Sequence, residues 1–287
     1  MSLRPNTRAG TQPAPLPRPH LAVPTPEQLA ARRLRRRTRL LRPAYWLPFV
    51  LLVVVLAVAW GIGARAMPYL FAPLGDIAGV LGEDPAYFLH NTLVTLGEAL
   101  VGLGIGFVAA FALAVVVSEI GVVRRAVMPI AVVLSVTPLV AIAPLLVVAL
   151  GFGMAPKVVL TALVCFFPIL INVATGLRAV PGPVLQVYRT VAASRLEVLR
   201  YLRIPASLPY VFASLRIVFP LSMIGAVVAE LSAAGSADGL GSVIQVASSQ
   251  NRLATVWAAI FVLAALGSLL FWLVTLAERR VLHWHQP

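Results

Sequence analysis

The chain has 287 residues, of which 60% are hydrophobic and only 11% are charged. Soluble domains are about 45–50% apolar and roughly 25% charged, so this composition excludes an ordinary soluble globular protein. The formal net charge is +13, and 22 of the 23 cationic residues are arginine. A basic chain can bind nucleic acid or a membrane, and the position of the arginines along the chain has to decide between the two.

The first 43 residues differ from the rest of the chain. Residues 1–26 are rich in Pro, Thr and Arg and lack apolar periodicity, which predicts a disordered tail. Residues 27–42 predict a short basic helix that ends at Pro43. Since no aromatic residue is interleaved with these arginines and a membrane span follows directly, a juxtamembrane segment is favoured over a nucleic-acid arm. We therefore expect a disordered basic cytoplasmic tail over 1–43 and no nucleic-acid partner.

Six apolar segments follow the tail, and each is close to the roughly 20 residues that a helix needs to cross the hydrocarbon core. The alternation typical of barrel strands is absent, so helices must satisfy the backbone groups in lipid. The first segment is too long for the apolar region of a signal peptide, roughly 7–15 residues, and is interpreted as a retained helix. The sequence thus predicts an all-α integral membrane protein with a six-helix transmembrane domain over 44–280. The spans are expected at 44–64, 89–117, 127–150, 157–178, 209–234 and 252–276.

The cationic residues fall mainly on one side of these spans. The N-terminal tail, the 118–126 loop, the 178–216 stretch and the C-terminus together carry 20 of the 23. Only Arg65, Lys157 and Arg252 fall on the other side. The positive-inside rule therefore predicts that both termini are cytoplasmic, and membrane insertion accounts for the basic composition without nucleic acid.

The longest cytoplasmic connection, about 179–208, has the pattern of an amphipathic helix. Pro181 and Pro183 end the fourth span, and apolar residues then alternate with arginines from Val184 to Leu202. One interpretation is a helix that lies on the lipid surface with its arginines at the headgroups. The other is a docking helix for a cytoplasmic partner. The residue pattern alone leaves both open.

The same connection resembles the cytoplasmic loop of bacterial ABC-importer permeases, whose pattern is Glu-Ala-Ala, three residues, Gly, nine residues, Ile-x-Leu-Pro. Ala192 stands at the glycine and 202–205 at the end of this pattern, while 186–188 depart from Glu-Ala-Ala. The stretch 189–195 is similar to the version in permeases of the nitrate, sulfonate and taurine type. Because alanine is strained where glycine adopts a positive φ, a shallower or partly helical turn is expected at Ala192.

Two further regions carry the resemblance. The stretch 166–169 with Asn172 is similar to the third-to-fourth span region of these permeases, and 228–230 followed by 239–241 is similar to their fifth span and external loop. The resemblance covers roughly 90–276. It implies the ABC type I importer permease architecture.

The resemblance also implies a function and a set of partners. The chain would be the membrane-spanning permease subunit of an ABC importer, forming the translocation path for a small, anionic or polar solute in the bacterial plasma membrane. It would act as a homodimer among membrane lipids, with two cytoplasmic ATP-binding subunits and an extracytoplasmic solute-binding protein. The ATPase-coupling loop would contain Arg189, Thr190, Ala192, Ala193, Ser194, Arg195, Leu199, Leu202 and Pro205.

Two carboxylates, Glu98 and Glu230, lie well inside the expected spans. A charge at mid-membrane costs about 2.5–3.5 kcal/mol on insertion scales, so such groups face protein or water. Together with Asn172 they are candidates for the translocation path, and interhelical hydrogen bonds are the alternative. Packing is favoured for Glu98 and a path position for Glu230. Gly102 and Gly106 form a small-xxx-small pair that predicts close approach of a neighbouring helix.

The sequence contains no pattern that indicates catalysis, a cofactor or a metal site. Lys157, the single lysine, is not part of a phosphate-binding loop, so ATP hydrolysis is expected on separate subunits and the chain is not expected to be an enzyme. The histidines do not cluster with carboxylates at metal-ligand spacing. The alternatives are an ATP-independent secondary transporter or channel, which would need Glu98 and Glu230 for proton coupling, and a non-transporting membrane scaffold.

Overall fold

The computed structural model describes residues 43–232 and 238–282. It divides into two units, one ending at Ala59 and one beginning at Trp60. Within the described residues every regular element is helical. The tail predicted over 1–43 lies outside the described residues apart from Pro43, where helix α2 begins.

Helix α2 (Pro43–Ala66) contains the first expected span. Its stretch Trp46–Ala66 is long and apolar enough to cross a membrane. In the first unit the side chains of this helix from Trp46 onward are apolar and exposed. A helix of this kind satisfies its backbone internally and leaves its side chains to lipid.

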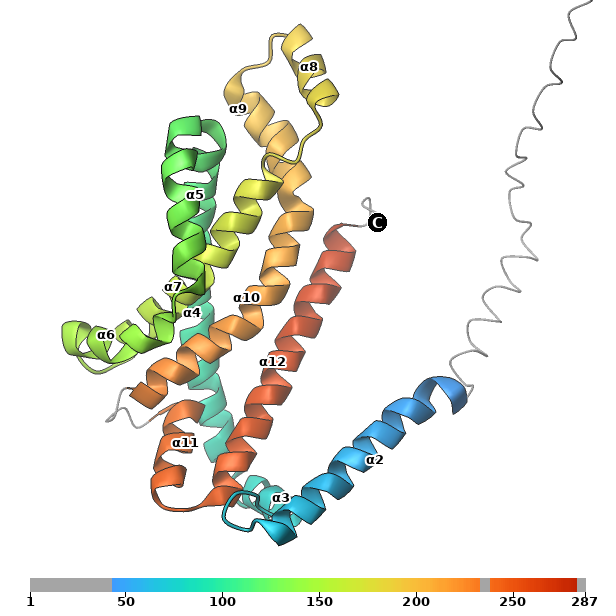
Figure 1. Ribbon diagram of the computed structural model, residues 1–287, viewed down its shortest axis with the longest axis vertical. Coiled ribbons are helices and arrows are strands. Elements are labelled where there is room, and N and C mark those ends of the chain that lie inside the picture. Colours follow the sequence, from blue (N-terminus) through green and yellow to red (C-terminus); the bar gives the residue numbers. More distant parts are fainter. Residues whose placement is uncertain (1–42, 233–237, 283–287) are drawn as a thin grey trace, which may run out of the picture. The chain divides into compact units, whose positions relative to one another are not determined.

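The second unit is an assembly of helices joined by short connections (Figure 1). After the end of α2 they are α3 (Leu74–Glu83), α4 (Pro85–Glu119), α5 (Gly121–Val136), the 3-10 turn η1 (Leu139–Ile142), α6 (Ala143–Leu150), α7 (Met154–Gly176), α8 (Gly182–Thr190), α9 (Arg195–Val198), the π-helical turn η2 (Leu199–Arg203), α10 (Ile204–Ser232), α11 (Leu240–Ser249) and α12 (Leu253–Val281). In the described part of the chain, five helices can cross a membrane by length and composition: α2, α4, α7, the continuous helix α9–η2–α10, and α12.

The third expected span, 127–150, is divided in the structure. Helix α5 ends at Val136, and α6 begins only at Ala143 after η1. Pro138 explains the break, because it lacks a backbone donor and forces the preceding residue out of the helical region. Thr137 is accordingly extended, with φ −70° and ψ 134°. Together α5, η1 and α6 occupy the place of the span that the hydropathy pattern presents as continuous.

The core of the second unit lies where α4, α7 and α10 pack against one another. Its largest apolar cluster includes the buried Leu170, Val173 and Val218. Gly102 and Gly106 let α7 approach α4 closely: a Cβ atom at either position would lie 2.6 Å from a side-chain or carbonyl atom of α7. The close approach predicted from this glycine pair is confirmed.

Two short helices, α3 and α11, were not expected from the sequence. Both lie at the end of the second unit away from α8 and α9 (Figure 1). There Trp60 and Trp257 meet edge to face with ring centroids 4.5 Å apart, and their indole N–H groups donate to the carbonyl oxygens of Ala72 and Leu70. Tryptophan with one apolar and one hydrogen-bonded end is typical of the membrane interface. This end therefore marks one face of the bilayer.

Candidate functional site

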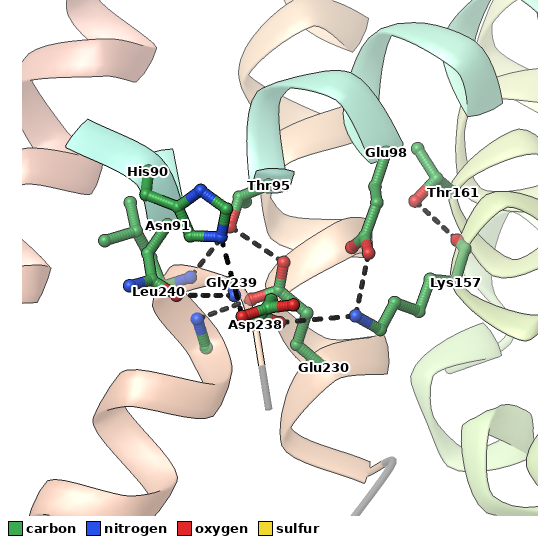
Figure 2. Close-up of polar contacts among 11 residues, drawn as sticks. His90, Asn91, Thr95, Glu98, Lys157, Thr161, Glu230, Asp238, Gly239 and Leu240 are labelled. Carbon is green, nitrogen blue, oxygen red and sulfur yellow. Dashed lines mark hydrogen bonds and ion pairs between the residues drawn. The ribbon is translucent and has the colours of Figure 1, made fainter. Parts of the chain in front are cut away.

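A group of polar side chains is buried where α4, α7 and α10 meet the start of α11 (Figure 2). We call it the polar cluster and define it as Asn91, Thr95, Glu98, Lys157 and Glu230. All five are at most 5% exposed. Polar groups removed from water in this way are costly unless they are paired or hydrogen-bonded.

One half of the polar cluster satisfies the N-terminus of α11. The backbone N–H of Gly239 donates to Asn91 Oδ1 at 2.8 Å, and that of Leu240 donates to Thr95 Oγ1 at 2.8 Å. The N–H of Gly241 donates to Glu230 Oε2 at 2.5 Å. The first N–H groups of a helix have no partner within the helix, and the N-terminus carries partial positive charge. Side chains of α4 and α10 supply the acceptors.

Glu230 is held from its other side as well. Thr95 Oγ1 donates to Glu230 Oε1 at 2.7 Å, so both carboxylate oxygens accept a hydrogen bond. Thr95 thus accepts from Leu240 and donates to Glu230 at the same time. This chain of bonds fixes α11 to α4 and α10. Gly239 has φ +111°, a backbone conformation that favours glycine, and it lets the chain enter α11 directly above these acceptors.

The other half of the polar cluster is a buried ion pair. Lys157 Nζ lies 2.7 Å from Glu98 Oε1, and the two side chains are 3% and 6% exposed. Lys157 also donates to the carbonyl oxygen of Asp238 at 3.5 Å. Glu98 Oε2 has no hydrogen-bond partner among the described residues. Glu230 interacts electrostatically with Glu98, so a second carboxyl group adjoins the ion pair.

The structure places the three residues predicted for a translocation path in two locations. Glu98 and Glu230 come together in the polar cluster. Asn172 lies in α7, where its Nδ2 donates to the carbonyl oxygen of Pro168 in the same helix at 2.8 Å. The contact with Lys157 agrees with the interhelical interaction considered for Glu98. The path role of all three stays a prediction.

Sequence reasoning missed Lys157, Asn91 and Thr95 as members of this site. The distribution of cationic residues placed Lys157 on the external side, but the sequence did not suggest an acidic partner for it. A signal was present, because the single lysine begins an apolar helix and Glu98 is a lone acid inside the second expected span. Opposite charges that enter the apolar phase in different helices of one bundle are expected to pair. The roles of Asn91 and Thr95 carried no comparable signal.

The second candidate region is the coupling segment, which we define as residues 182–203 (α8, α9 and η2). It lies at the opposite end of the second unit from α11 (Figure 1). None of its residues is buried. Of the residues predicted for the coupling loop, Leu199 and Leu202 are half-buried, as is Ala193, and the others are exposed: Arg189, Thr190, Ala192, Ser194, Arg195 and Pro205.

The turn between α8 and α9 is a complete left-handed helix end. Ala192 has φ +54°. The N–H of Ala192 donates to the carbonyl of Arg189, and the N–H of Ala193 donates to the carbonyl of Tyr188, both at 3.0 Å. These two bonds are those of the Schellman motif, whose left-handed residue is usually glycine. The expectation of a shallower turn at Ala192 is therefore wrong. Both hydrogen bonds of the full turn are present, and Ala192 adopts the left-handed conformation despite its steric cost.

Helix α9 begins directly after this turn with a capping box. Ser194 Oγ accepts from the N–H of Glu197, and Glu197 Oε2 accepts from the N–H of Ser194 at 2.7 Å. At the end of the coupling segment, Arg203 Nη1 donates to Glu119 Oε1 at 2.5 Å. Arg203 lies in η2 and Glu119 ends α4, so the segment is joined to the core helices.

These features define a polytopic helical membrane protein. It has long apolar helices, with the buried polar cluster at one end of the second unit and the exposed, well-capped coupling segment at the other. A comparison with protein families identifies the class more narrowly. Residues 102–283 match the family described as binding-protein-dependent transport system inner membrane component. The chain belongs to this family, and it is a membrane-spanning permease subunit of an ABC importer. Such subunits are not enzymes, and the family implies ATP-binding subunits and a substrate-binding protein.

Several relatives are permeases of named transport systems. The formylaminopyrimidine transport permease of Halalkalibacterium halodurans is 31% identical over 239 residues, covering 82% of this chain and 95% of the relative. The riboflavin transport permease of Chloroflexus aurantiacus is 31% identical over 257 residues, covering 88% and 94%. The taurine transport permease of Escherichia coli is 28% identical over 268 residues, covering 90% and 96%. Relatives of this kind confirm the resemblance to the nitrate, sulfonate and taurine type.

The fold is also similar to a solved structure. A chain of the MetNI methionine ABC transporter in an inward-facing conformation matches with a TM-score of 0.61 and 18% sequence identity. The match covers 69% of this chain and 98% of that chain. It confirms the all-α permease fold.

Proposed function

We propose that two copies of this chain form the translocation path for a small, anionic or polar solute in the bacterial plasma membrane, and that the coupling segment docks on a cytoplasmic ATP-binding subunit. In this proposal both termini are cytoplasmic and 1–43 is a tail outside the transmembrane domain over 44–280. One ATP-binding subunit binds each copy. An extracytoplasmic binding protein delivers the solute at the end that holds α3 and α11.

The observation that carries this proposal is the exposed tip of the coupling segment, which contains two capping motifs. Val187, Val191 and Leu196 are 61%, 71% and 70% exposed. They stand beside the exposed Arg189 and Arg195. Apolar side chains surrounded by cations on a segment with two capping motifs present a preformed surface to a partner, which reduces the ordering cost of binding. A helix that only rests on lipid gains nothing from a fixed turn at a strained alanine.

The position of the segment also supports coupling. Leu199 and Ile204 pack against the main apolar cluster, and Arg203 is paired with Glu119 at the end of α4. A displacement of α9 is therefore passed to α4 and α10 through packed side chains and an ion pair. Rigid-body motion of packed helices is the general way in which such transporters alternate their access.

The polar cluster is the proposed fixed point at the other end of these helices. It joins α4, α7 and α10 to the start of α11. Motion that begins at the coupling segment would thereby reach the external loop on which the binding protein acts. Glu98 and Glu230 then position the wall of the path, and Asn172, which is half-buried in α7, is the candidate that faces it.

The names of the relatives indicate a range of possible solutes and no single one. Their names refer to taurine, riboflavin and a formylaminopyrimidine, which are small and polar. The binding protein is the subunit expected to select among such solutes. The ATP-independent transporter is less favoured, because both Glu98 and Glu230 are engaged in fixed contacts rather than facing an aqueous space.

Substitution of Ala192 by Trp tests the docking role. A bulky side chain at the tip should abolish co-purification of the ATP-binding subunit and solute uptake without affecting membrane insertion. Ala277→Trp, the same change at an exposed position near the end of α12, is the matched control and should retain both. Leu196→Asp provides a second variant whose turn geometry is unchanged, and it should also lose the subunit. Arg200→Gln should be tolerated, since docking depends on individual contacts more than on summed charge. Retention of the ATP-binding subunit by both Ala192→Trp and Leu196→Asp would exclude the coupling role.

A further inference from the structure

Two adjoining cavities lie at the end of the second unit that carries the coupling segment. The larger has a volume of about 420 Å³ and the smaller about 300 Å³. Arg124 and Arg178 line both of them. Arg124 lies in the first turn of α5, and Arg178 follows the last turn of α7. The two cavities therefore form one continuous site between α4, α5 and α7, which we call the arginine cavity.

The arginine cavity carries an unbalanced positive charge. Its third arginine, Arg203, is already paired with Glu119, and that glutamate also lines the smaller cavity. For the side chains of Arg124 and Arg178, the described part of the chain offers no ion pair or hydrogen bond. The start of α5 at Gly121 adds the partial positive charge of a helix N-terminus. Two free guanidinium groups that face one cavity favour an anion that both can bind, and a phosphate group fits their paired donors.

The larger cavity is amphipathic as well as cationic. Val117, Met128 and Ala174 line it together with the two arginines, and Met128 and Ala174 lie one helical turn from Arg124 and Arg178. Tyr210 lines it too, with 36% of its surface exposed. An aromatic residue with a polar end marks the headgroup level of a bilayer. A free phosphate ion makes no favourable contact with the apolar residues of this cavity. A phospholipid can place its phosphate at the arginines and its acyl chain along α4, α5 and α7.

We propose that the arginine cavity binds the phosphate headgroup of an anionic phospholipid. Basic pockets between transmembrane helices at the cytoplasmic surface are a general way to hold such headgroups. The proposal uses the orientation proposed above only to decide which leaflet supplies the lipid. It adds a ligand that the permease function does not require.

The site also lies next to the coupling segment. Leu185 of α8 and Arg203 of η2 line the smaller cavity. A bound headgroup therefore contacts the base of the segment from α5 and α7. Occupancy should stabilise the position in which α8 leaves the core, so lipid composition should change the thermal stability of the complex without any change in the docking tip.

Native mass spectrometry of the complete transporter, permease with its ATP-binding subunits, tests the proposal. The probe is phosphatidylglycerol, supplied in mixed micelles with phosphatidylcholine as the neutral reference. The wild-type complex should retain phosphatidylglycerol in preference, and added lipid should raise its midpoint of thermal unfolding. Arg124→Gln with Arg178→Gln should weaken retention roughly 30-fold, because each arginine that contacts the bound headgroup contributes about a fivefold factor.

The matched control removes the same charge at the same end of the protein. Arg125 is exposed, adjoins Arg124 in sequence and lines neither cavity, and Arg279 lies near the end of α12. Arg125→Gln with Arg279→Gln should retain phosphatidylglycerol within about threefold of wild type. Equal loss in the two double variants would mean that summed charge and not this cavity holds the lipid, and the proposal would be overturned.

A further arm separates the two sources of phosphate. Inorganic phosphate at the same concentration should leave the thermal midpoint unchanged. If it stabilises the wild-type complex as well as phosphatidylglycerol does, the site is one for a free anion and the lipid proposal fails. The ATP-binding subunit should co-purify with the Arg124→Gln, Arg178→Gln variant, so failure of lipid binding and failure of the coupling role are distinguishable.

Discussion

Replacement of Lys157 by Met should destabilise the permease more than any other single change in the polar cluster. The ammonium group is 3% exposed and lies 2.7 Å from Glu98 Oε1, and Glu98 in turn interacts electrostatically with Glu230. Removing it leaves two carboxylates near one another without a cation. Loss of one partner of a buried ion pair costs about 3–5 kcal/mol, and the second carboxylate places Lys157→Met at the upper end of that range.

Replacement of Glu98 by Gln should cost less, about 1–3 kcal/mol, for a reason that the geometry supplies. The lysine then keeps an amide oxygen as its acceptor, so the hydrogen bond is retained although the ion pair is lost. The Lys157→Met, Glu98→Gln double variant should be more stable than Lys157→Met alone, because one uncompensated charge has been removed. This order of stabilities follows if Lys157 and Glu98 form a single electrostatic unit.

The measurement is the midpoint of thermal unfolding of the purified permease, followed by tryptophan fluorescence. At about 2–4 °C per kcal/mol for a domain of this size, Lys157→Met should unfold roughly 10 °C below wild type. Arg65→Met removes an exposed cation on the same side and should shift the midpoint by less than about 2 °C. A Lys157→Met protein as stable as wild type, or less damaged than Glu98→Gln, would refute the reasoning.

Three further changes test the helix contacts, the strained turn and the cap of α11. Gly106→Leu should prevent α4 from packing on Ala162 of α7 and give little monodisperse protein in size-exclusion chromatography, whereas Gly104→Leu, where a Cβ meets nothing within 4 Å, should behave as wild type. Ala192→Gly should relieve roughly 1 kcal/mol of left-handed strain and slow hydrogen exchange of the turn amides; faster exchange would contradict the strain argument. Glu230→Ala should insert normally but reduce solute uptake and stability, because two hydrogen-bond donors lose their acceptor. Glu230→Gln should reduce uptake and stability less. Normal uptake by Glu230→Ala would show that the cap of α11 has no part in transport.

The sequence by itself determined the class of protein. Hydrophobic runs of membrane length and the unequal distribution of arginine are properties of the linear chain, so they could be recognised without any tertiary contact. The resemblance of the coupling segment to the cytoplasmic loop of ABC-importer permeases could be found for the same reason, because it lies in a local pattern around Ala192, and the docking role of the segment stays a prediction. The close helix contact at Gly102 and Gly106 was also encoded locally, by two small residues on one helical face.

The tertiary structure decided how the polar residues are used. Lys157 and Glu98 are 59 positions apart, and Gly239 is 148 positions from the side chain of Asn91 that accepts its hydrogen bond. No periodicity records such pairings, because they arise only when α4, α7 and α10 pack and exclude water from the groups between them. Likewise, hydropathy summed over 127–150 could not reveal the break at Pro138, since the lost backbone donor does not change how apolar the segment is. The sequence determined which segments enter the membrane, and packing determined which buried charges meet there.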